Sequence, residues 1–111
     1  MATIDFSNTV TDSITFAKNE LGKSWKDFKD FAEHHFTQLA KDAEFLAGLK
    51  LKGILSDDEF IARFTLQKLH LQNVLLTIKG IGLVTAQNLV NGVVAIIGKT
   101  IKKSLGIVLP V

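Results

Sequence analysis

The stretch Leu55-Ser56-Asp57-Asp58-Glu59-Phe60 contains the most specific local signal in the sequence, and it predicts where a helix begins. Ser56 and Glu59 have the spacing of a capping box, in which each side chain accepts a hydrogen bond from the other residue's backbone N–H. The apolar residues at the two ends of the stretch match a hydrophobic staple. The two aspartates add negative charge at the positive end of the helix dipole. We therefore predict a helix from this capping box to about residue 79.

Upstream of the capping box, apolar residues recur at steps of three and four from Val10 to Ala47. This is the period of a helix, without the alternation of a strand. The spacing predicts one long, amphipathic and aromatic helix over residues 10–49. Gly22 weakens this helix by about 1 kcal/mol relative to alanine and marks the place where a bend is expected. Four members of the apolar stripe lie 11 residues apart, a period that keeps the stripe nearly straight: Ile14, Trp25, Phe36 and Ala47.

Downstream of residue 79, Gly80 and Gly82 interrupt the chain, and an aliphatic third helix is predicted over residues 83–103. Residues 104–111 are expected to form an extended apolar tail. The chain has 111 residues, the size of a single domain. We therefore expect one all-α domain over residues 1–111, a helical hairpin or a three-helix bundle. The predicted second helix has a wide apolar arc and the third is apolar nearly all round, so we expect oligomerisation to complete the fold.

Charge and aromatic residues are divided unevenly along the chain. Residues 1–59 hold all 11 acidic residues and seven of the 13 basic ones, a net charge of −4. Residues 60–111 hold no Asp or Glu and six basic residues, a net charge of +6. All eight Phe and the single Trp lie at or before Phe64. The basic residues of the second part are too sparse, and too far from stacking aromatics, to predict nucleic-acid binding.

Residues 80–98 contain no charged side chain, and lysines stand on both sides of them. Nineteen uncharged residues are about the length that crosses a bilayer, roughly 20 residues. Gln87, Asn88 and Asn91 are polar groups in the middle of this stretch, and no Trp or Tyr marks a membrane interface. We therefore favour a helix buried in a bundle or in an oligomer interface over a membrane span.

The sequence contains no motif of a known catalytic chemistry. The absence of Cys excludes disulfides, thiolate metal sites and Cys nucleophiles. Asp30 and His34 share a helix face and are weak candidates for a metal site, but the Glu-x-x-His repeats of di-metal bundles are absent. We predict no enzymatic activity, no cofactor and no metal. The polar N-terminus, residues 1–9, lacks the apolar run of a signal peptide, which favours a cytoplasmic or membrane-associated protein or export without such a signal.

Three functions remain as hypotheses, and we favour a structural or interaction protein that forms homo-oligomers or binds a helical partner. The second is a membrane-associated or membrane-inserting protein that uses residues 80–98, and the third is a helical bundle that binds a small ligand or a metal. Three lysines are predicted to contact an anionic surface: Lys99, Lys102 and Lys103. The predicted assembly or membrane face consists of aliphatic residues: Leu83, Val84, Leu89, Val90, Val93, Val94, Ile96, Ile97 and Ile101.

Overall fold

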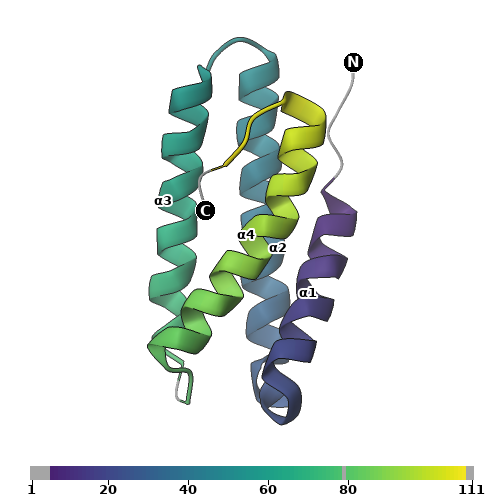
Figure 1. Ribbon diagram of the computed structural model, residues 1–111, viewed down its shortest axis with the longest axis vertical. Helices are drawn as coiled ribbons and strands as arrows, with labels where there is room; N and C mark the ends of the chain where they lie inside the picture. Colours follow the sequence, from purple (N-terminus) through teal and green to yellow (C-terminus); the bar gives the residue numbers. More distant parts are fainter. Residues whose placement is uncertain (1–5, 79, 110–111) are drawn as a thin grey trace.

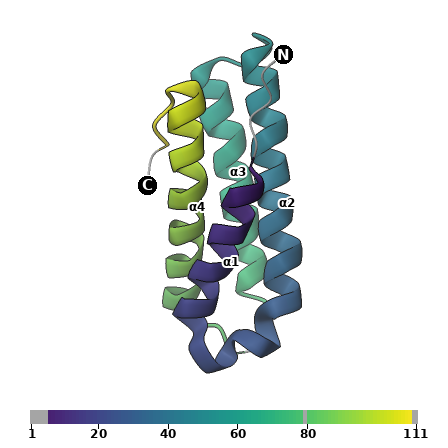
Figure 2. The same cartoon turned by 90° about the vertical axis from the view of Figure 1, so that its right-hand side faces the viewer.

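The chain folds as an all-α bundle, as the sequence predicts, and the computed structural model describes residues 6–78 and 80–109. Within these residues the chain forms four α-helices, which run alternately up and down (Figure 1). Helix α1 touches α2 and α4, and α3 also touches α2 and α4. Figure 2 places α1 in front of the other helices and α3 behind, so α1 and α3 occupy opposite corners of the bundle. The helices are α1 (Ser7–Leu21), α2 (Trp25–Leu51), α3 (Asp57–Leu75) and α4 (Leu83–Leu105).

The predicted capping box is confirmed at the start of α3. The Ser56 hydroxyl accepts a hydrogen bond from the Glu59 N–H at 3.2 Å, and the Ser56 N–H donates to Glu59 Oε1 at 3.0 Å. The Ser56 N–H, and after it the Ser56 side chain, lower the pKa of Glu59, because hydrogen bonds to its carboxylate favour the charged form. An ion pair of 2.9 Å between Lys50 and Asp57 joins the end of α2 to the first turn of α3. Local interactions therefore fix the α2–α3 hairpin.

The prediction of one continuous helix over residues 10–49 is wrong. Residues 22–24 form a single 3₁₀ turn, and the chain reverses there, so that α1 packs antiparallel to α2 (Figure 1). Gly22 has φ +55° and ψ −118°, a conformation that residues with a Cβ rarely adopt. The 11-residue repeat persists across the reversal because the apolar stripes of α1 and α2 face the same core. The repeat therefore does not describe one straight stripe.

Two other predicted boundaries move by a few residues. Helix α3 ends at Leu75 and not near residue 79, and the Thr77 hydroxyl donates to the Val74 carbonyl in the turn that follows. Helix α4 continues to Leu105, and Gly106 ends it in the left-handed conformation, with φ 72°. Of the predicted tail, residues 104–105 belong to α4, and residues 106–109 have no regular secondary structure and pack back on the bundle through the buried Ile107 and Leu109; residues 110–111 lie outside the described part.

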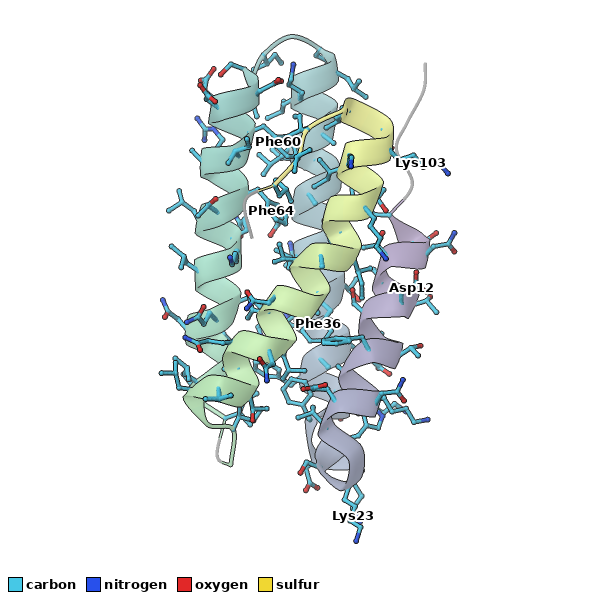
Figure 3. All side chains as sticks on the ribbon, viewed as in Figure 1. Asp12, Lys23, Phe36, Phe60, Phe64 and Lys103 are labelled. Atoms are coloured by element: carbon cyan, nitrogen blue, oxygen red, sulfur yellow. The ribbon has the colours of Figure 1, made fainter. Side chains whose placement is uncertain are left out.

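The core lies along the axis of the bundle. Figure 3 shows Phe36 on α2 and Phe60 and Phe64 on α3 pointing inward, and all three are buried. Between α1 and α4 the helices come close at Gly92, where an added Cβ would overlap the Phe16 ring. A hydrogen bond of 3.2 Å between the Thr9 and Thr100 hydroxyls also joins these two helices. Gly92 therefore admits an aromatic side chain of α1 against the backbone of α4.

We predict that the effect of Gly92→Ala depends on Phe16. Alanine raises helix propensity by about 1 kcal/mol, but in the wild-type chain its methyl group displaces the Phe16 ring. In a Phe16→Ala background the ring is gone, and only the gain in propensity remains. We expect Gly92→Ala to be less favourable by at least about 1 kcal/mol when Phe16 is present, measured by denaturant unfolding of the four proteins. Equal effects in both backgrounds would contradict this packing.

Candidate functional site

Most of the aliphatic face that the sequence assigns to assembly or membrane contact lies inside the chain's own core. Six of its nine residues are buried between α4 and the other helices: Leu89, Val90, Val93, Val94, Ile97 and Ile101. Ile96 is half-buried, and only Leu83 and Val84, in the first turn of α4, are exposed. The intramolecular bundle therefore already covers the surface for which a partner was expected. The sequence predicted two or three helices, whereas the reversal at Gly22 supplies a further one that helps to cover α4.

The structure also bears on the proposed membrane span over residues 80–98. Helix α4 begins only at Leu83, after the turn that contains Gly80. No helix within residues 6–78 and 80–109 is long and apolar enough to cross a membrane.

Several exposed apolar side chains belong to α3 or to the chain next to it. Leu66 and Leu69 have exposed fractions of 66% and 48% and lie on its outer side, and Leu76, 40% exposed, directly follows its last residue. The other exposed large apolar residues of the described chain are Phe45, Leu51, Ile54, Leu83, Val84 and Val108. The sequence indicated a broad apolar arc on this helix and predicted that oligomerisation would help to cover it, but the residues named for the assembly face all lay on α4.

The outer residues of α3 follow a heptad pattern. From Ala62 the successive steps are four, three, four and three residues, and every residue of the series is exposed: Ala62, Leu66, Leu69, Asn73 and Leu76. We call this series the α3 seam. In a heptad it occupies the two seam positions, a and d. Phe64 and Leu71 fall at the position farthest from the seam, and both are buried in the core. The 4-3-4-3 spacing is the signal in the sequence from which this surface could have been predicted.

The three lysines that were grouped as an anionic-surface contact separate in the structure. Lys99 and Lys102 line a pocket between α3, α4 and the C-terminal segment, together with Lys68 of α3. Lys103 does not line this pocket, and Figure 3 shows its side chain pointing away from α3, on the side of α1. Two of the three grouped lysines therefore line the pocket, and the third does not.

All three histidines of the chain lie close together. His34 and His35 of α2 and His70 of α3 line a cavity of about 170 Å³, and Asp42 also lines it. The His35 ring lies 4.1 Å from the Phe31 ring and 4.8 Å from the His34 ring, between centroids. In the described part of the chain, no group of three or more His, Asp or Glu side chains is placed to hold a metal ion.

The surroundings of His35 disfavour its protonated form. Burial lowers the pKa of His35, and positive charge on His34 and His70 lowers it further. A histidine with a lowered pKa takes up its proton more readily in the unfolded chain than in the folded one. Its destabilising effect is therefore absent above the ordinary histidine pKa, and develops as the pH falls from that value toward the folded-state pKa.

We predict that acidification across the ordinary histidine pKa lowers the Tm of the wild-type protein more than that of His35→Gln. The glutamine cannot be protonated, so the part of the pH dependence that comes from this position disappears. Thermal unfolding followed by circular dichroism over a series of pH values measures the difference. Parallel Tm profiles for the two proteins would show that His35 does not contribute.

Comparison of the chain with protein-family models, with curated proteins and with solved structures gives no match.

Proposed function

We propose that this protein is a non-enzymatic interaction protein that self-associates through the α3 seam. The observation that carries the proposal is the set of exposed leucines on the side of α3 that faces away from the core. A globular helix normally places its polar residues on that side. Self-assembly, which the sequence predicts, is thus assigned to α3 and not to α4, where six of the nine predicted residues are buried.

The position of α3 in the bundle favours contact between two copies of this helix. Because α1 and α3 lie at opposite corners, α3 forms an edge of the molecule (Figure 1). Two bundles can meet along this edge with their α3 helices side by side. The seam has five members over two heptads, so the expected contact is a short two-stranded coiled coil.

Asn73 favours a parallel arrangement of the two helices. Leu66 and Asn73 occupy the a positions of the heptad, and Ala62, Leu69 and Leu76 occupy the d positions. In a parallel pair the a positions face each other, so the two Asn73 amides can form a hydrogen bond. In an antiparallel pair Asn73 faces a d-position residue, alanine or leucine, and its amide is left without a partner.

Charged residues beside the seam favour the same arrangement. In a parallel coiled coil, each g position lies near the e position five residues further along the other helix. This rule places Asp58 beside Arg63 of the second copy, and symmetry gives the same pair twice. An antiparallel pair brings e positions together, and Arg63 then lies beside His70. The pattern of charges thus agrees with the position of the asparagine.

The size of the seam indicates a reversible dimer. Complete burial of an exposed leucine contributes about 1.5–3 kcal/mol, and the seam leucines are already partly covered. The three leucines of each copy therefore contribute several kcal/mol together, which is comparable with the entropic cost of association, about 4–15 kcal/mol. We expect a dimer whose population rises with protein concentration.

The first test compares two apolar positions of equal exposure. Leu66 on α3 and Phe45 on α2 are both 66% exposed. We predict that sedimentation equilibrium detects a dimer for the wild type and for Phe45→Glu, and only a monomer for Leu66→Glu. Circular dichroism confirms that the variants are folded. A wild-type chain that stays monomeric at the highest attainable concentration, or a dimer that Leu66→Glu leaves intact, would refute the proposal.

A charge exchange then tests the arrangement. Arg63→Glu alone places carboxylates opposite Asp58, and Asp58→Arg alone places two guanidinium groups opposite each other. Both single variants should weaken the dimer, and the double variant should restore it. If the double variant is as weak as the single ones, the parallel register is wrong even where the Leu66 test succeeds.

A further inference from the structure

A pocket of about 210 Å³ lies where the C-terminal segment folds back between α3 and α4. Helix α4 crosses the front of the bundle obliquely, and the chain beyond Gly106 returns toward α3 (Figure 1). Leu109 is buried, and its side chain lies beside Gly98, which has no side chain to fill the space. The apolar lining of the pocket comes from α4 and from this segment: Val94, Ala95, Gly98, Val108 and Leu109.

The polar lining of this pocket is entirely cationic or neutral. It consists of Lys68 from α3, and Asn91, Lys99 and Lys102 from α4. The chain has no Asp or Glu after Glu59, so these parts of α3 and α4 carry no acidic side chain. In the part of the chain that the structure describes, the only ion pair joins Lys50 to Asp57. The lining of the pocket therefore offers three ammonium groups and no carboxylate.

We propose that this pocket binds a single-chain anionic amphiphile, such as a fatty-acid carboxylate. The lysine ammonium groups and the Asn91 amide donate hydrogen bonds to the anionic head, and the aliphatic lining covers the first part of the alkyl chain. Pockets for drug-sized ligands have volumes of about 300–1,000 Å³, so this smaller pocket fits one chain and not a two-chain lipid.

The lining distinguishes this ligand from other anions. No aromatic residue lines the pocket, so it lacks the stacking surfaces that bind single-stranded nucleic acids. A small inorganic anion would satisfy the lysines but leave the aliphatic lining in contact with water. The combination of charge and apolar surface therefore requires a ligand that has both.

The site is separate from the α3 seam. Lys68 is half-buried on the side of α3 toward α4, whereas Leu66 and Leu69 lie on its exposed outer side. Binding of the amphiphile is therefore expected to persist in Leu66→Glu, and failure of the dimer proposal does not affect it.

Isothermal titration calorimetry with laurate, kept below its micelle concentration, tests the proposal. We expect one laurate per chain, with an affinity that falls as salt is added. Dodecyltrimethylammonium has the same chain and the opposite charge, and acetate has the charge without the chain. Neither of these probes should bind. The proposal is overturned if laurate does not bind, or if dodecyltrimethylammonium binds as tightly as laurate.

Two variants and a matched control locate the binding. Lys99→Ala combined with Lys102→Ala should weaken laurate binding at least tenfold, and Lys103→Ala, a neighbour outside the pocket, should leave it unchanged. Gly98→Leu should abolish binding by filling the cavity, while its Tm shows that the fold remains. Equal weakening by Lys103→Ala means a diffuse charge effect and contradicts the assignment. Binding only to anionic vesicles, without binding of free laurate, means a membrane surface and contradicts it too.

Discussion

The packing of α1 against α4 is the interaction on which the rest of the structure depends. Helix α4 carries the most apolar sequence of the chain, and its residues from Leu89 to Ile101 need cover on more than one side. The reversal at Gly22 brings α1 back along α2 and places it beside α4. The close approach at Gly92 and the Thr9–Thr100 hydrogen bond then hold the two helices together. The chain thereby buries, within one molecule, a helix whose apolar sequence is typical of an oligomer interface.

This arrangement determines which surfaces are left for function. Helices α2 and α4 each touch the three other helices, whereas α1 and α3 lie at corners and touch two. Helix α1 meets solvent with polar residues such as Asp12, which points outward in Figure 3. Helix α3 exposes leucines to solvent on its outer side. The basic pocket lies between α3, α4 and the C-terminal segment.

The sequence predicted the parts of the structure that local interactions determine. Ser56 and Glu59 lie three residues apart, so their reciprocal hydrogen bonds could be inferred without knowledge of the fold. The reversal at Gly22 could not, because the apolar spacing continues through it in phase. One continuous helix produces this apolar spacing around residue 22, and so do two helices that are joined by a turn and face the same core. Only the backbone angles at Gly22 distinguish them.

The candidate surfaces were harder to predict, for a related reason. An apolar face such as Val90 and Ile97 has the same sequence whether the chain's own helices or a second molecule covers it. Tertiary packing decides between these alternatives. It buries most of the apolar face of α4 in the core and leaves Leu66 and Leu69 exposed to solvent. The pocket lysines come from helices about 30 residues apart in the chain and are brought together only by the fold.

Amide hydrogen exchange followed by NMR tests most directly whether the chain covers α4 by itself. We predict that backbone amides between Ala86 and Ile101 are among the slowest to exchange, with the same protection in dilute and concentrated solution. Rapid exchange of these amides at low concentration, with protection that appears only as the concentration rises, would show instead that a partner covers the helix.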